Sequence, residues 1–431
     1  MLQILARGCA AASVLFILGS GGPAPAAETG TIEEIVSILR SEGLIDEATR
    51  QKLLAKHHNE QRRRAAVSAG PLSGLEWTGE LRLRHEAFWF DGDATGTPEP
   101  DNRYRFRYRA RLGFQKQVSE RVRVGMRLAS GTGSARSTNV SFGEQPDWRP
   151  DDIFIDRAWA ELRLTEGRVR TRLVAGRVAN PFQWSIGMDR LMWDPDIAPE
   201  GAYLEARTGL GENAKLWATL GAFIAEEKSV NADPKLFGLQ LGGSTRLSDT
   251  LEIGGRISGY EWRSLDQDFI RRALDSGNLP SAFDGRARIG ELSAYARITA
   301  NDTWPLLVYG TYERNFTADS ALIDGLPTDE EDTAWGAGFE LGDAAKIAKL
   351  GFAFYRVEAN AIVASFADSD FLAGGTNREG FVAYASRKLG PRVELRLTFI
   401  DVEEIRSSSP FTESLGGADR RRLQSDVLVS F

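Results

Sequence analysis

One stretch, residues 103–114, limits what the chain can fold into more than any other. It reads Arg-Tyr-Arg-Phe-Arg-Tyr-Arg-Ala-Arg-Leu-Gly-Phe, so that arginines alternate with mostly apolar residues. Successive side chains of a β-strand point to opposite faces, which would put a row of guanidinium groups on one face and a row of rings on the other. Neighbouring guanidiniums cannot lie in a dry core. The stretch therefore predicts a strand in the wall of a transmembrane β-barrel, with lipid outside and a water-filled lumen inside.

The N-terminus has the pattern of an export signal. Arg7 precedes an apolar run from Ala10 to Leu18, and Ala24-Pro25-Ala26 has the small residues of a cleavage site. We predict a signal peptide over residues 1–27, because the apolar run is too short for a retained membrane anchor. The chain's one cysteine, Cys9, lies in this segment, so the exported chain would have no disulfide and no thiolate metal site.

Residues 28–70 have the periodicity of helices. Thr31 and Glu34 fit a capping box at the start of one helix, Gly43 would end it, and Asp46 can cap a second. We expect a periplasmic helical hairpin or short coiled coil, followed by a small-residue linker. Two roles stay open for it: an oligomerisation or plug-like element, or a segment that binds a partner such as peptidoglycan.

The remainder of the chain, residues 75–431, has strand periodicity throughout. We expect sixteen strands, each long enough for a tilted membrane strand, near residues 75–90, 103–118, 121–131, 153–164, 168–178, 202–210, 214–227, 235–247, 251–262, 290–298, 304–315, 332–342, 348–359, 378–389, 392–403 and 421–431. The fold class predicted is all-β: a sixteen-stranded antiparallel transmembrane β-barrel, preceded by a short α-helical segment.

The connections between these strands alternate in length. Short turns such as Gly211-Glu212-Asn213 follow the even-numbered strands, and long polar loops such as 132–152, 179–201 and 263–289 follow odd-numbered ones. Outer-membrane barrels have this asymmetry, with periplasmic turns and extracellular loops. A soluble β-sandwich has no reason to sort its connections in this way. The alternation therefore decides between the two classes.

Aromatic residues near the strand ends fit the two girdles of such a barrel. One set consists of Trp77, Trp304, Trp335 and Phe431, and the other of Trp89 and Trp262. A last strand ending in the aromatic residue Phe431 also resembles the signal by which the bacterial barrel assembly machinery recognises its substrates.

Several segments resemble a Gram-negative family known as putative porins. They are residues 77–84, the arginine-rich stretch, residues 180–184 and residues 192–201. Membership would imply a pore in the cell outer membrane and says little about the solute. By analogy with other sixteen-stranded porins, the chain would form a homotrimer.

Arginines on the inferred lumen face recur on neighbouring strands. We expect the pore-lining and selectivity residues to be Arg82, Arg84, Arg107, Arg109, Arg111, Arg127, Arg157 and Arg172. A three-residue turn near Ser119 would place Arg111 opposite Arg127. In general porins a long loop folds inward and sets carboxylates against wall arginines. By that analogy, the loop after the third strand would supply Glu144, Asp147, Asp151 and Asp152 as constriction acids.

Three interpretations of the arginines stay open. They could solvate the wall and pair with Glu80, Glu86 and Glu161, set up a transverse field across a constriction, or form a ladder for phosphate and other anions. Guanidinium suits the last role because its forked donors bind oxyanions bidentately. The interspersed carboxylates argue against it.

Other chemistries have little support. The acidic loop after Asp91 begins like a calcium site, but Asn102 stands where the bidentate glutamate belongs, so we predict no metal and no cofactor. The barrel's one histidine, His85, shares the lipid-facing parity, and no nucleophile motif accompanies it, which argues against an enzyme. A net charge of −7 argues against a nucleic-acid partner.

These observations together predict an outer-membrane porin for passive diffusion and ion transport. Its partners would be small hydrophilic solutes or ions, outer-membrane lipid and the assembly machinery. The alternatives are a phosphate- or anion-selective channel, and a structural protein that tethers the envelope through its N-terminal helices.

Overall fold

The computed structural model describes residues 30–68, 73–91, 102–187, 191–323, 326–371, 375–406 and 419–431. The chain divides into two compact units, Met1–Ser73 and Gly74–Phe431. The predicted signal peptide, residues 1–27, lies outside the described residues. Within the described part of the chain, no helix combines the length and apolar character needed to cross a membrane.

The first unit contains two helices, α1 (Gly30–Ser41) and α2 (Glu47–Ser68). Gly43 ends the first with a φ of 69°, a value that glycine adopts without strain. Asp46 caps the second, because its Oδ1 accepts a hydrogen bond from the Thr49 backbone N–H at 2.7 Å. The second helix runs further than the sequence pattern suggested. Its later residues are mainly Gln, Arg and Ala, which favour helix even without an apolar face.

The second unit is a closed antiparallel barrel of sixteen long strands, and every expected strand is present. They are β1 (Leu75–Asp91), β2 (Arg103–Gln117), β3 (Val122–Ser130), β5 (Ile153–Glu166), β6 (Val169–Arg177), β7 (Glu200–Leu210), β8 (Ala214–Ile224), β9 (Lys235–Ser248), β10 (Leu251–Arg263), β11 (Arg286–Ile298), β12 (Leu306–Asn315), β15 (Thr333–Gly342), β16 (Lys349–Val357), β17 (Arg378–Lys388), β18 (Val393–Glu404) and β19 (Asp419–Ser430).

Short elements occur in the connections. They are β4 (Val140–Ser141), η1 (Pro146–Trp148), α3 (Gln267–Leu274), η2 (Pro280–Ala282), the pair β13 (Ala321–Ile323) and β14 (Leu326–Thr328), and η3 (Ala364–Phe366). All lie in long connections. The barrel therefore has a turn end and a loop end, as the alternation of connection lengths predicted.

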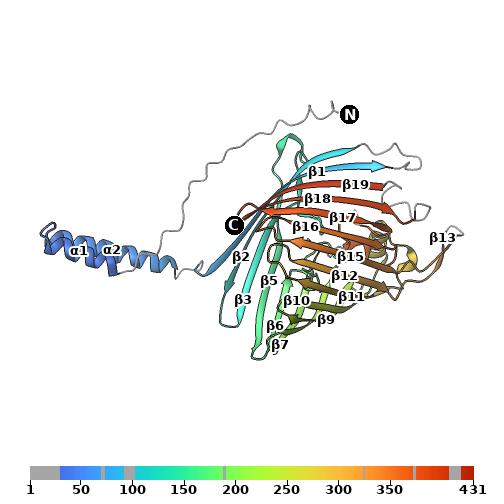
Figure 1. The fold of residues 1–431 in the computed structure, drawn as a ribbon, viewed down its shortest axis with the longest axis horizontal. Coiled ribbons are helices and arrows are strands. Elements are labelled where there is room, and N and C mark those ends of the chain that lie inside the picture. Colours follow the sequence, from blue (N-terminus) through green and yellow to red (C-terminus); the bar gives the residue numbers. More distant parts are fainter. Residues whose placement is uncertain are drawn as a thin grey trace. The chain divides into compact units, whose positions relative to one another are not determined.

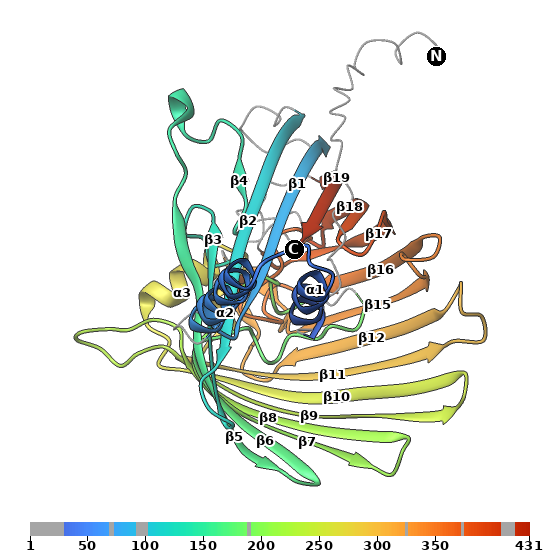
Figure 2. The same ribbon diagram turned by 90° about the vertical axis from the view of Figure 1, so that its left-hand side faces the viewer.

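The barrel closes where the first and last strands meet, and Figures 1 and 2 show β1 between β2 and β19. Leu81 pairs with Ala110 on one side and with Val429 on the other. Beyond the last strand, the Phe431 backbone N–H donates to the Gly79 carbonyl at 3.0 Å. The Phe431 ring covers Gly79, where a Cβ would stand 2.1 Å from it. The terminal aromatic is thus part of the closure.

The two faces of β2 divide as the alternation predicted. Tyr104 and Phe106 are 61% and 57% exposed on the outer surface, which a bilayer would cover. Arg107 and Arg109, of opposite parity, are half-buried inside. One detail of register differs: Arg111 pairs with Ala129 rather than with Arg127. The connecting turn is longer than expected, and because the shift is two residues, every side chain keeps its face.

Two long connections fold into the lumen. We call residues 178–187 and 191–199 the first inner loop, and residues 358–371 and 375–377 the second inner loop. Phe182, in the first, is fully buried and packs edge-on against Tyr260 of the wall at a ring separation of 5.3 Å. Phe371, in the second, is equally buried against Tyr355 at 5.1 Å. The two loops and the facing wall share one apolar core inside the barrel.

Two of the predicted girdle residues lie elsewhere. Trp262 is only 2% exposed and belongs to this inner core, because it has the inward parity of β10. Trp335 lies near the beginning of β15 and is therefore at the loop end of the barrel. Trp304 lies in the turn before β12 and is therefore at the turn end. The assignment of Trp262 failed because its parity was not considered, and that of Trp335 failed because strand direction was not considered.

Candidate functional site: the arginine wall

Arginines from adjoining strands meet on one side of the lumen. We call this set the arginine wall; it consists of Arg82, Arg84, Arg105, Arg107, Arg109, Arg111, Arg127, Arg157, Arg420 and Arg422. The register brings them together, since Arg82 lies directly opposite Arg109, and Arg84 opposite Arg107. Like charges facing each other would be unfavourable. The wall therefore depends on the carboxylates set among the arginines.

Glu86 is the most buried of these carboxylates, with no exposed surface. It accepts hydrogen bonds from Arg105 and Arg422, and from the Gln424 side chain at 3.2 Å. Arg107 lies 3.8 Å from it. A carboxylate so fully surrounded by donors balances the cations of three strands, β1, β2 and β19.

Arg84 connects the wall to the second inner loop. Its Nε and Nη2 donate to the two oxygens of Asp426 at 2.6 and 2.9 Å, a bidentate pair across the barrel closure. Its Nη1 donates to Asp370 of the second inner loop at 3.1 Å. Arg422 also reaches Asp370, at 2.9 Å.

Asp196 connects the wall to the first inner loop. It accepts a hydrogen bond from Arg111 Nη2 at 2.6 Å and lies 3.6 Å from Arg109 Nη1. The Thr138 backbone N–H also donates to it, at 3.0 Å. Burial alone would raise the pKa of Asp196, but the two guanidinium groups outweigh it and lower the pKa to about 2. The carboxyl is ionised throughout the physiological range.

A β-bulge adds a further acid to the wall. The pairing of β3 with β5 shifts between Arg127 and Leu128, so Asp156 faces inward beside Arg157. Asp156 is buried and pairs with Arg127. Arg157 Nε is buried and, among the described residues, has no hydrogen-bond acceptor.

Arg172, the remaining predicted arginine, faces the lumen away from this cluster. It pairs with Glu161 at 2.9 Å and with Glu205 at 2.8 Å, nearer the turn end. The structure therefore brings together seven of the eight predicted arginines and adds Arg105, Arg420 and Arg422. The last two lie at the start of β19 on the parity of Gln424.

The predicted constriction acids are placed differently. Glu144, Asp147 and Asp152 are exposed, and Asp151 accepts a hydrogen bond from Tyr108 on the outer face of β2. Among the described residues, none of these four acids pairs with the arginine wall. Burying this charged segment would be costly, whereas the apolar run 191–193 can enter the barrel. The inner loops supply the acids instead, as Asp196 and Asp370.

Part of the loop after β3 does reach the wall. Thr138 Oγ1 accepts from Arg111 at 2.6 Å, and Asn139 accepts from Arg82. β4 then pairs with β2, with Ser141 opposite Arg107, and the chain leaves the lumen. Polar neutral groups, rather than carboxylates, come from this loop.

The result is a lumen with two unlike sides. Guanidinium groups line β1, β2, β3, β5 and β19, while carboxylates on the inner loops face them and rings cover the opposite wall. Charges of opposite sign that face each other across a lumen create a transverse electric field. The described residues contain no group of three or more His, Cys, Asp or Glu side chains placed to hold a metal ion.

Known proteins resemble this chain in fold and in family. OprB of Pseudomonas putida, in a high-pH structure, matches 89% of this chain and 96% of its own at 11% identity, with a TM-score of 0.52. OmpF of Salmonella typhi, in complex with daunomycin, matches 83% and 97% at 13% identity, with a TM-score of 0.49. No curated protein sequence matches the chain.

At such identities, the likeness to OprB concerns the fold alone. The family comparison goes further, because the model described as "Putative porin" matches residues 94–273 and 281–415. The match spans most of the barrel, including β2 of the arginine wall and the first inner loop. The chain therefore belongs to the putative porin family, whose fold is that of an outer-membrane channel.

Proposed function

We propose that this protein lets small hydrophilic solutes diffuse passively across the outer membrane, with a preference for anions. The observation that carries the proposal is the composition of the arginine wall. Among the described residues, eight of the wall's ten arginines form ion pairs, and these eight share six carboxylates: Glu80, Glu86, Asp156, Asp196, Asp370 and Asp426. The surplus of positive charge would raise the local concentration of anions in the lumen.

The carboxylates also limit what the wall can be. A dedicated phosphate ladder would need guanidinium forks left open for the solute. Most forks here already hold a carboxylate, as Arg84 holds Asp426. We therefore favour a general channel with a transverse field over a phosphate-selective one. The field would act between the wall and the acids of the two inner loops.

The proposal includes the surroundings of the barrel. We place the loop end outside the cell and the helices α1 and α2 in the periplasm. We also propose a homotrimer, assembled after the barrel machinery has recognised Phe431. Chemical cross-linking of the purified protein tests the trimer, and deletion of residues 28–70 tests the helices. A channel keeps its conductance after that deletion, whereas a tether would lose envelope integrity.

Reconstitution tests the function directly. Purified protein in planar bilayers should give discrete single-channel conductance in potassium chloride, and a salt gradient should give a reversal potential on the anion side. Liposomes containing the protein should swell in small neutral solutes such as glycerol. Absence of conductance from a folded barrel would contradict the proposal.

A further inference from the structure

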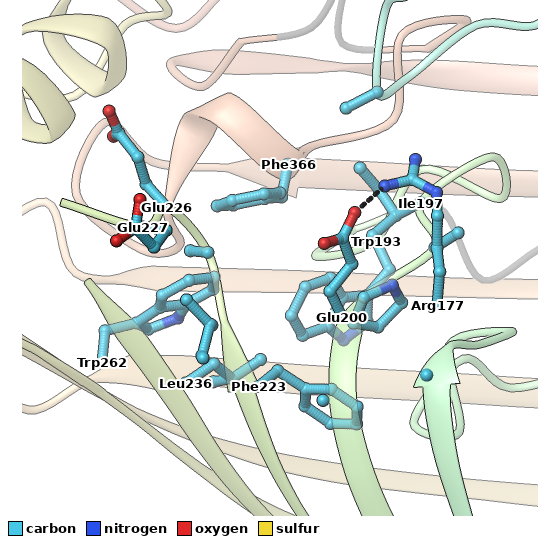
Figure 3. Close-up of a pocket in the computed structure, with 17 residues that line it drawn as sticks. Arg177, Trp193, Ile197, Glu200, Phe223, Glu226, Glu227, Leu236, Trp262 and Phe366 are labelled. Carbon is cyan, nitrogen blue, oxygen red and sulfur yellow. Dashed lines mark hydrogen bonds and ion pairs between the residues drawn. The ribbon is translucent and has the colours of Figure 1, made fainter. Parts of the chain in front are cut away.

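The barrel contains a cavity at its loop end, lined by none of the ten residues of the arginine wall. Its volume is about 640 Å³, which is within the range of small-molecule sites. The first inner loop contributes Trp193 and Ile197, the barrel wall contributes Phe223 and Trp262, and η3 of the second inner loop contributes Phe366. Figure 3 shows these side chains arranged around the cavity.

Three aromatic rings of the lining form a cluster. Trp262 stacks on Phe366 with ring centroids 4.9 Å apart, and Trp193 lies 6.3 Å from each of them. Rings grouped in this way attract the ring of a ligand, because offset and edge-on aromatic contacts add to the burial of apolar area. A purely hydrophilic solute would gain little from such a surface.

The polar groups left open beside these rings are hydrogen-bond donors. Trp193 and Trp262 are only 5% and 2% exposed. Their indole N–H groups are buried and have no acceptor among the described residues. Indole nitrogen can only donate. A ligand that suits the cavity therefore carries acceptor oxygens.

Charge is unevenly placed around the cavity. Arg177 pairs with Glu200 on one side, and Glu226 and Glu227 lie on the other, as Figure 3 shows. Glu226 is already neutralised by Lys228, at 2.7 Å, and by Arg272. A ligand carboxylate on the Arg177 side of the cavity can share that guanidinium with Glu200, and it lies away from Glu227.

We propose that this cavity binds small aromatic carboxylates, with the ring against the cluster of Trp193, Trp262 and Phe366 and the carboxylate toward Arg177. The inference rests on the proposed function, since it names a solute class for an anion-favouring channel. It adds a saturable site to what would otherwise be simple diffusion. Arg177 and the aromatic rings would then recognise the two parts of one molecule.

Benzoate is the probe for this site, measured in two independent ways. Equilibrium dialysis against the detergent-solubilised barrel should show saturable binding that acetate and glucose do not compete. In planar bilayers, benzoate added on the loop side should interrupt the single-channel current with the same half-saturation concentration. Dialysis does not depend on conduction, so binding without conductance would support the site while contradicting the proposed channel. Conductance without benzoate binding would overturn the site alone.

Two variants test the contacts. Phe366→Leu removes the ring stacked on Trp262 and should weaken benzoate binding about fivefold. Arg177→Gln should weaken benzoate but leave benzyl alcohol, which has the ring without the charge, unchanged. Phe352→Leu, on the outer face of β16, is the matched control and should bind benzoate as the unaltered protein does. Equal competition by glucose, or wild-type binding by both cavity variants, would overturn the proposal.

Discussion

Asp196 of the first inner loop accepts a hydrogen bond at 2.6 Å from Arg111 of strand β2. The two residues are 85 positions apart in the sequence and both are largely buried. Their contact fixes a loop from the loop end against the arginine wall. The contact also leaves the Arg111 guanidinium with fewer free donors for a solute. The acids on the inner loops therefore set how much positive charge the lumen presents.

Removing this carboxylate should make the channel more anion-selective. In Asp196→Asn, Arg111 and Arg109 lose a counter-charge, so the ratio of anion to cation permeability should rise roughly two- to fivefold, since a unit charge about 4 Å from an ion in water is worth about 1 kcal/mol. Reversal potentials in a potassium chloride gradient measure this ratio. Asp147→Asn, in the exposed loop, is the control. A larger shift of the reversal potential in Asp147→Asn would show that the loop after β3, rather than the first inner loop, supplies the acids of the constriction.

Truncating Glu86 should destabilise the barrel strongly. Glu86→Ala leaves Arg105 and Arg422 buried without their main acceptor, and breaking a buried ion pair costs about 3–5 kcal/mol. The free energy of unfolding in detergent and denaturant would report the loss. Glu76→Ala, exposed near the start of β1, should change it by less than about 1 kcal/mol. Similar values for both variants would show that the network is dispensable.

The substitution Gly238→Ala tests how the first inner loop docks against the barrel wall. A Cβ on Gly238 would stand 2.4 Å from the ring of Phe182, which is fully buried. Gly238→Ala should therefore lower the free energy of unfolding by about 1–3 kcal/mol and alter conductance as the loop shifts. Gly259→Ala, on the next strand, has nothing within 4 Å of its added Cβ. Unaltered stability and conductance in Gly238→Ala would contradict the docking.

Acid should release the first inner loop within a narrow pH range. The pKa of Asp196 is lowered to about 2, so its ionised form stabilises the fold above the unfolded value of about 4. This stabilisation is lost as the pH falls from about 4 through 2. The unfolding temperature of the unaltered protein should fall more steeply over this range than that of Asp196→Asn. Parallel curves would show that Asp196 contributes nothing to docking.

The strands could be predicted because each carries its own signal. In residues 103–114 the alternation alone assigns the faces, and no distant contact is needed to interpret it. The turn lengths assign the two ends of the barrel in the same way. The register between strands was harder to predict from the sequence. Arg111 pairs with Ala129 because the turn is longer than expected. Asp156 faces inward only because of a bulge, which the alternation hides.

The choice of inner loop could not be made from charge. Acidic residues in the loop after β3 suggested that it faces the arginines, yet a loop enters a lumen when it can bury apolar residues. Leu191 and Phe182 are both fully buried, and their apolar character was visible in the sequence. The partner acid, Asp196, lies in the same family motif, residues 192–201. Apolar content would therefore have been the better guide than acidity.

The central claim is that the arginine wall gives the lumen its charge preference. Single-channel reversal potentials of the unaltered protein and of the triple variant Arg109→Ala, Arg111→Ala, Arg127→Ala test it most directly. The account predicts an anion-favouring potential for the unaltered protein and a shift toward cations in the variant, with the barrel still folded. An identical reversal potential for the two would contradict it.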